Sequence, residues 1–230
     1  MTRLANSIHT IAFDADDTLW CNENFYLEAT ERFYAIVRRY CDETLIAEAF
    51  AQREARNMDE LGYGAKAMTI SMVETALSLC PDIPHDALHA IIEAGRALLR
   101  IPTVMLPNVV ETLTALQSRF QILILTKGET KEQQRKFDNS PLPKNIPYII
   151  LPDKCAETYR RIFDRFAMDP SKFLMVGNSP RSDILPPLQL GAYACYIPYH
   201  TTWAHENLPL PEHPRLIRLS NISELNSVLA

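Results

Sequence analysis

The 230-residue sequence has no long apolar run and no excess of positive charge. Its apolar stretches stay far below the ~20 residues that a membrane-spanning helix needs. The formal net charge is −5 and like charges do not gather in runs, which argues against nucleic acid as a partner. The N-terminal residues have neither the apolar core nor the small-residue cleavage site of a secretion signal. We therefore expect a cytoplasmic protein that binds neither a membrane nor nucleic acid.

The cysteines also show no pairing pattern. The five cysteines are scattered and none forms a CxxC spacing, which is typical of reduced, buried thiols and not of a disulfide framework or a zinc site. Apolar residues make up 47% and charged residues 22% of the chain, as in ordinary globular proteins. A chain of this length buries enough surface to fold without a disulfide or a structural metal.

The hydrophobic pattern changes along the chain. Residues 8–13 predict a short buried strand, and helical periodicity then covers about 23–40, 42–57, 66–80 and 85–100. After residue 107, strand patterns at 121–125, 148–151, 173–176 and 192–197 alternate with helical patterns at 108–119, 129–137 and 155–167. Such alternation predicts a parallel sheet with helices on both faces.

We therefore expect an α/β protein of two domains. Residues 1–21 and 103–230 form a Rossmann-like core, and residues 22–102 form an all-helical, four-helix cap that is inserted after the first strand. Open α/β sheets bind ligands at the carboxyl ends of their strands. An insert that leaves from the end of strand one is therefore expected to cover that site.

Three carboxylates, Asp14, Asp16 and Asp17, directly follow the first strand. Like charges this close raise one another's pKa or require a cation. One explanation is an ordinary surface turn or helix cap. The other is a divalent-metal site with a carboxylate nucleophile, because Mg²⁺ prefers one or two carboxylates together with phosphate oxygens.

Polar residues also follow three later strands. Thr126 and Lys127 end the strand at 121–125, Lys154 follows the strand at 148–151, and a polar stretch from Gly177 to Asp183 follows the strand at 173–176. The ends of parallel strands meet at one edge of a sheet, so these groups are expected to converge. Ordinary alternatives exist, because Thr126 can cap a turn, Lys154 can be a solvated lysine and Asp183 can cap a helix.

Taken together, these residues resemble the four motifs of the haloacid dehalogenase (HAD) superfamily. The matching segments are Asp14-x-Asp16-x-Thr18-Leu19, the strand-ending Thr126, Lys154, and Gly177-Asn178-Ser179-x-x-x-Asp183. The resemblance covers about residues 8–200, and the helical insert lies where that superfamily carries a helical cap.

The resemblance implies a set of roles. Asp14 would be the nucleophile that forms an aspartyl-phosphate, and Asp16 would act as general acid and then as general base. Thr126, Lys127 and Lys154 would bind the phosphoryl group. The implied cofactor is Mg²⁺, with its ligands drawn from Asp14, the carbonyl of Asp16, Asn178 and Asp183.

Three residues depart from the family pattern. Asn178 stands where phosphatases of this family usually carry aspartate, Lys127 where asparagine is frequent, and Asp17 where glycine is common. The last two are tolerable because the contacts at those positions are largely made by the backbone. The first removes a negative charge from the metal site, so we expect Mg²⁺ to bind with modest affinity.

Several functions remain open at this stage. The first is a phosphatase that acts on a small phosphorylated metabolite. A dehalogenase would use the same nucleophile but has no need of Asp16, whereas a phosphomutase would use Asp16 equally well. A non-catalytic binding or regulatory protein with this fold is disfavoured by the intact Asp14, Asp16, Thr126 and Lys154.

Two further segments are candidates for the site. A polar, glycine-containing stretch of the cap is expected to connect two helices and to contact the leaving group; it contains Arg53, Arg56, Asn57, Tyr63, Gly64 and Lys66, of which Arg53, Tyr63 and Lys66 are the predicted substrate ligands. A solvated loop is the alternative. His200, His205 and Glu206 suggest a metal site, but their spacing fits no known pattern, so a polar loop at the rim of the site is favoured.

Overall fold

The computed structural model describes residues 7–201 and 203–230, so the N-terminal stretch and Thr202 lie outside it. The described chain forms two compact units. The α/β unit contains the residues through Glu23, Thr103–Lys127 and Gln133–Ala230, and the helical unit contains Asn24–Pro102 together with Gly128–Glu132. The expected division placed 128–132 with the core; these residues instead group with the helices. Among the described residues, no helix is both long enough and apolar enough to cross a membrane.

The α/β unit is built on a six-stranded sheet in which all neighbouring strands are parallel. The strands are β1 (Thr10–Phe13), β2 (Gln121–Lys127), β3 (Tyr148–Leu151), β4 (Phe173–Gly177), β5 (Tyr193–Tyr196) and β6 (Leu216–Arg218), in the spatial order β3-β2-β1-β4-β5-β6. The predicted α/β fold with a parallel sheet is confirmed. The sequence pattern did not predict β6, because three residues are too few to show a periodicity.

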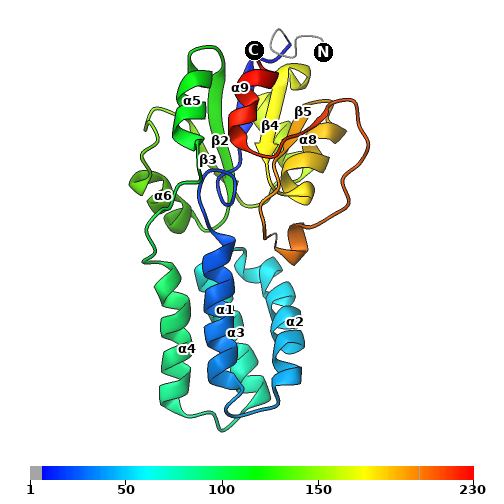
Figure 1. Cartoon of the computed structure of the whole chain (residues 1–230). Coiled ribbons are helices and arrows are strands. Elements are labelled where there is room, and N and C mark those ends of the chain that lie inside the picture. Colours follow the sequence, from blue (N-terminus) through cyan, green and yellow to red (C-terminus); the bar gives the residue numbers. More distant parts are fainter. Residues whose placement is uncertain (1–6, 202) are drawn as a thin grey trace. The chain divides into compact units, whose positions relative to one another are not determined.

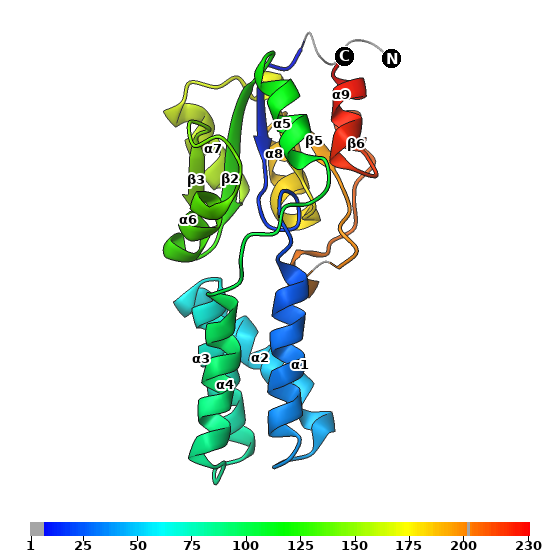
Figure 2. The ribbon, with the colours of Figure 1, turned by 60° about the vertical axis from the view of Figure 1, so that its left-hand side comes forward.

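The central strands send alternate side chains to two helical layers. Ile11 and Phe13 of β1 pack in one cluster with α5 (Val109–Gln117), α9 (Leu225–Val228) and Phe137 of α6 (Thr130–Asn139). Ala12 faces the other way and packs with α7 (Ala156–Arg165), and α8 (Leu185–Gln189) packs on β5. Figure 2 shows α5 and α9 side by side. Both faces are therefore buried, which is why the middle of the central strands is apolar.

The helical unit contains the four predicted helices (Figure 1). They are α1 (Glu23–Val37), α2 (Glu43–Leu61), α3 (Ala65–Leu79) and α4 (His85–Leu98). Each helix contributes a buried side chain to the same apolar cluster, namely Phe33, Phe50, Met72 and Ile91. The helix expected at 42–57 continues to Leu61, so the predicted polar connection shrinks to residues 62–64.

The start of α3 is capped by a side chain from the 128–132 segment. Gly64 precedes the helix and has no side chain to cap it, but Glu132 accepts hydrogen bonds from the Ala65 amide at 3.0 Å and from the Tyr26 hydroxyl at 2.8 Å. A Cβ on Gly64 would lie 2.9 Å from Glu132 Oε2, and the φ angle of +104° also favours glycine there. These contacts explain why residues 128–132 group with the helical unit.

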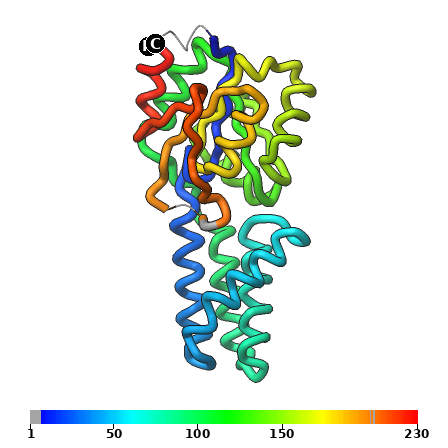
Figure 3. Tube along the Cα trace, turned by 90° about the vertical axis from the view of Figure 1, so that its right-hand side faces the viewer, coloured from blue at the N-terminus to red at the C-terminus, as the bar shows by residue number. Residues whose placement is uncertain are grey.

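The strand order places the site. β1 lies between β2 and β4, and the chain crosses from β3 on one side of β1 to β4 on the other. Ligands of such sheets bind outside the carboxyl ends of the strands, where the order switches. The connection from β5 to β6 also reaches this edge, and Figure 3 follows it in orange as it leaves β5 and returns to β6.

Candidate functional site

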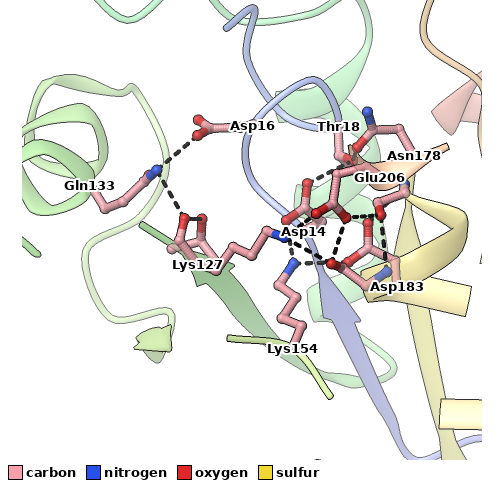
Figure 4. Close-up of polar contacts among 12 residues, drawn as sticks. Asp14, Asp16, Thr18, Lys127, Gln133, Lys154, Asn178, Asp183 and Glu206 are labelled. Atoms are coloured by element: carbon pink, nitrogen blue, oxygen red, sulfur yellow. Dashed lines mark hydrogen bonds and ion pairs between the residues drawn. The ribbon is translucent and has the colours of Figure 1, made fainter. Parts of the chain in front are cut away.

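A buried lysine joins two carboxylates beyond the ends of β1 and β4. Lys154 lies between β3 and α7, and its Nζ makes ion pairs with Asp14 Oδ1 and, at 2.8 Å, with Asp183 Oδ1 (Figure 4). All three residues are at least 93% buried, since Asp14 is 7%, Lys154 3% and Asp183 0% exposed. The structure therefore brings together residues from three segments that are far apart in the sequence. This convergence was expected from the parallel sheet, whose strands end at one edge.

Burial and charge act against each other in this group. Burial raises the pKa of Asp14 to about 7, the neighbouring Asp183 adds to this rise, and Lys154 opposes it. Burial alone would lower the pKa of Lys154, but the two carboxylates outweigh burial and raise it. Lys154 is therefore a permanent cation, and it supports the ionised form of Asp14 that a nucleophile requires.

The oxygens of Asp14 and Asn178 converge on a single hydroxyl. Thr18 Oγ1 lies 3.2 Å from Asp14 Oδ2 and 3.2 Å from Asn178 Oδ1, and all three residues are buried. A carboxylate and an amide oxygen that converge in this way are ligands of the kind that Mg²⁺ accepts. The donor chemistry at this point therefore fits the implied cofactor.

Asp183, the remaining predicted side-chain ligand, is already engaged by other groups. The carboxylate of Asp183 is engaged by Lys154 and by the amide of Ser179, at 3.0 Å. Within the described part of the chain, no three His, Cys, Asp or Glu side chains are grouped to hold a metal ion. His200, His205 and Glu206 are thus not grouped to hold a metal ion, and the sequence had favoured a polar loop for them.

Asp183 occupies a space that only glycine leaves open. A Cβ on Gly177, the last residue of β4, would lie 2.2 Å from Asp183 Oδ2. The turn that carries Asp183 is held from the other side, because the buried Tyr159 hydroxyl of α7 donates to the carbonyl of Ser182 at 3.0 Å. Gly177 is thus required for close approach, and its role needs no positive φ angle.

Asp16 turns its carboxylate toward α6 (Figure 4). It accepts hydrogen bonds from Trp20 Nε1 at 2.7 Å and Gln133 Nε2 at 2.8 Å, and its two oxygens lie 3.0 and 3.1 Å from Lys136 Nζ. These three donors were not predicted from the sequence. A signal was present, because Gln133 and Lys136 are three residues apart and share one face of a helix.

Asp17 has a structural task that explains its departure from glycine. Its φ angle is +60°, in the left-handed region, where aspartate is among the more tolerated residues. The buried carboxylate accepts hydrogen bonds from the amides of Asn22, at 2.8 Å, and Glu23, at 3.0 and 3.2 Å. Asp17 therefore caps the start of α1. A helix cap was one of the two explanations that the sequence offered for the acidic cluster.

Lys127 pairs with a residue that the sequence placed only at the rim. Its Nζ makes an ion pair with Glu206 and lies 3.0 Å from Ser182 Oγ. Glu206 is 7% exposed and also accepts hydrogen bonds from the hydroxyls of Ser179 and, at 2.5 Å, Ser182. The β5–β6 connection thus inserts a carboxylate between β2 and the loop after β4.

The remaining predicted residues are placed as follows. Thr126 is 1% exposed at the end of β2, and its hydroxyl lies 3.4 Å from the carbonyl of Lys127. Arg53 lies within α2, 3.8 Å from Glu74, and Lys66 lies in the first turn of α3, 3.1 Å from Glu129. Tyr63 alone of the three predicted cap ligands lies in the connection between the helices. The substrate roles of Arg53, Tyr63 and Lys66 stay predictions.

Comparison with known proteins identifies the family. A family model described as haloacid dehalogenase-like hydrolase matches residues 8–191. The chain belongs to the haloacid dehalogenase-like hydrolases. The pyrimidine 5'-nucleotidase YjjG of Escherichia coli K12 is 29% identical over 209 residues, which cover 83% of this chain and 86% of that protein.

Solved structures agree with this assignment. A HAD-like family hydrolase from Xanthomonas campestris is 32% identical, with a TM-score of 0.88 over 97% of this chain and 91% of that one. The HAD hydrolase YfnB of Bacillus subtilis, solved with magnesium, has a TM-score of 0.68 at 17% identity, over 97% and 99% of the two chains. A 2-haloacid dehalogenase from Pseudomonas syringae has a TM-score of 0.62 at 19% identity, over 96% and 98%. The last two show the common fold.

Proposed function

We propose that this HAD hydrolase is a Mg²⁺-dependent phosphatase that acts on a small phosphate monoester through an aspartyl-phosphate. The observation that carries the proposal is the buried group of Asp14, Lys154 and Asp183, with Thr18 and Asn178 beside it. Phosphoryl transfer needs a positioned nucleophile and neutralisation of the phosphoryl oxygens. This group offers both at the carboxyl edge of the sheet.

In the first step an oxygen of Asp14 attacks phosphorus and the bond to the ester oxygen breaks. Asp16 gives its proton to the departing oxygen, so that an alcohol leaves. In the second step Asp16 takes a proton from water, whose oxygen attacks the phosphorus of the aspartyl-phosphate. Inorganic phosphate is released and the carboxylate of Asp14 is regenerated, with Asp16 protonated as before.

The chain's own cations and oxygens support these steps. Lys154 stabilises negative charge on Asp14 and on the phosphoryl oxygens, and Thr126 donates to a phosphoryl oxygen. The side chains of Asp14 and Asn178, with the carbonyl of Asp16, would hold Mg²⁺. When bound, Mg²⁺ would supply further neutralisation of the phosphoryl charge.

Asp16 favours phosphate esters over carbon–halogen bonds. Halide is a good leaving group that needs no proton, whereas an alkoxide leaving group gains from a general acid. Three N–H donors, from Trp20, Gln133 and Lys136, hold the Asp16 carboxyl group in place. The similarity to a pyrimidine 5'-nucleotidase makes nucleoside monophosphates the first substrates to test.

The deciding experiment measures release of phosphate from 4-nitrophenyl phosphate with and without Mg²⁺, followed by a panel of phosphorylated metabolites. Asp14→Asn should abolish turnover, because an amide cannot form the acyl phosphate. Wild-type activity in a clean Asp14→Asn preparation would refute the proposal. Release of halide from 2-haloacids, without phosphatase activity, would favour the dehalogenase alternative.

A further inference from the structure

Lys127 and Glu206 form a nearly buried charge pair beside the Asp14 group. Lys127 ends β2 and Glu206 belongs to the short turn Ala204–Glu206 in the β5–β6 connection. Their side chains are 15% and 9% exposed. In Figure 4 both side chains extend toward Asp14 and Asp183, and their low exposure keeps the pair from bulk solvent.

Glu206 carries its charge despite being buried. Burial raises its pKa, but the ammonium of Lys127 and the hydroxyls of Ser179 and Ser182 outweigh burial and lower the pKa overall. The charge is felt within the site, because Glu206 is one of the groups that raise the pKa of Asp183. The pair therefore places one positive and one negative charge within the site and adds no net charge.

We propose that the Glu206–Lys127 pair sets the balance between cation and anion binding at this site. The inference rests on the proposed function, in which the site binds both Mg²⁺ and a phosphate group. It also explains why lysine is acceptable at position 127, where the family often has asparagine. Asn178 leaves the proposed metal site one negative charge short, and Lys127 adds a positive charge nearby. Glu206 neutralises the charge of Lys127.

Removing either partner should shift the two affinities in opposite directions. Glu206→Gln keeps a side chain that hydrogen-bonds but leaves the charge of Lys127 uncompensated, so Mg²⁺ should bind about three- to tenfold more weakly and inorganic phosphate correspondingly more tightly. Lys127→Met leaves the charge of Glu206 uncompensated and should do the reverse. The double variant Lys127→Met/Glu206→Gln should bring both affinities back toward the wild-type values.

The experiment is isothermal titration calorimetry of the full chain with Mg²⁺ alone and with inorganic phosphate alone. Lys131→Met and Asp82→Asn change the net charge by the same amounts at exposed positions and serve as controls that should change neither affinity. Opposite shifts in the single variants, with recovery in the double variant, would support the pair as an electrostatic device.

Two other outcomes would overturn the inference. Loss of affinity for both ligands in each single variant would show that the pair only holds the loop after β4 in place. Unchanged affinities in both variants would show that its charges do not reach the site. If the wild-type chain binds neither ligand, both the proposed function and the inference are refuted. If it binds both ligands and hydrolyses 4-nitrophenyl phosphate, the variants test the inference alone.

Discussion

The Asp16 carboxylate and the Lys136 ammonium form an ion pair, with 3.0 and 3.1 Å between Lys136 Nζ and the two carboxylate oxygens. Lys136 is only 9% exposed and also donates to Asn22 Oδ1 at 2.6 Å. Because N–H donors engage both oxygens of Asp16, this geometry fixes the orientation of its carboxyl group. Lys136 therefore acts on the proposed reaction through Asp16, as a positioning residue.

Lys136→Met should slow the hydrolysis of esters with poor leaving groups. Without the ion pair, Asp16 samples other positions and delivers its proton less often. We expect kcat for a simple alkyl phosphate to fall about tenfold, a part of the ~10²–10⁴-fold that general acid–base catalysis typically contributes. Turnover of 4-nitrophenyl phosphate, whose leaving group needs little protonation, should fall less than about threefold in the same steady-state assay.

The comparison between the two esters separates positioning from general damage. Lys131→Met, an exposed substitution on the same helix, is the matched control and should leave both rates unchanged. An equal loss on both esters in Lys136→Met would mean that the change disturbs the site as a whole.

Asp17→Asn should stabilise the protein at neutral and higher pH. Burial raises the pKa of Asp17 to about 7 in the folded chain, against its ordinary value of 3.8, although the Asn22 and Glu23 amides oppose this rise. The folded state therefore holds a proton that the unfolded state releases, and wild-type stability falls as pH rises from about 4 to 7. Asparagine keeps the acceptor oxygen and tolerates the left-handed conformation.

Chemical denaturation at several pH values measures this effect. The gain from Asp17→Asn should be absent at pH 4 and should reach at least about 1 kcal/mol above pH 7. The exposed substitution Asp82→Asn makes the same charge change in a surface turn and should show no such pH dependence. A gain that is equal at all pH values would assign the effect to something other than the Asp17 proton.

The sequence predicted the fold well because its signals were local and periodic. Apolar runs such as Ile122–Leu125 and the 3.6-residue pattern of α3 each indicate their element without reference to the rest of the chain. The elements that were missed, β6, α8 and α9, have three to five residues each. Such short elements are defined by the sheet or helix on which they pack.

The site was predictable only where a residue follows a strand. Asp14, Lys154 and Asp183 converge because parallel strands bring their carboxyl ends to one edge. The partnership of Lys127 with Glu206 joins residues 79 positions apart and depends on the path of a long connection. Nothing in the local pattern specifies that path, so Glu206 was predicted only as a part of the rim.

Gly177→Ala should displace Asp183 and impair the site. The added Cβ would lie 2.2 Å from Asp183 Oδ2 and 2.6 Å from Asp183 Cβ, so a rotation of the side chain cannot relieve the overlap. We expect a loss of stability of about 1–3 kcal/mol, as for other overpacked positions, and at least about a tenfold loss of kcat. Thermal unfolding and phosphate release measure the two effects, and a fully active Gly177→Ala variant would show that the loop after β4 shifts at no cost.

Lys66→Ala should raise KM for the physiological substrate and spare small aryl phosphates. The proposal behind this expectation is that the cap residues contact the leaving group and not the transferred phosphoryl group. Glu129→Gln removes the charge partner of Lys66 at 3.1 Å and leaves the lysine in place, so it serves as the companion variant and should not weaken substrate binding. An equal loss on both classes of substrate in Lys66→Ala would remove Lys66 from the set of substrate ligands.

Asn178→Asp should tighten Mg²⁺ binding by about tenfold. Asn178 Oδ1 lies 3.2 Å from the same Thr18 hydroxyl that Asp14 Oδ2 contacts, so a carboxylate at position 178 places a second negative charge at the proposed metal site. A hard dication binds more strongly to a charged than to a neutral oxygen ligand. The new carboxylate also repels Asp14 and the substrate phosphate, so the expectation concerns affinity and not rate. Calorimetric titration with Mg²⁺ and the Mg²⁺ dependence of turnover should agree. Unchanged or weaker binding would show that Asn178 is not a ligand and would move that role to Asp183, whose carboxylate would then have to exchange Lys154 for the metal.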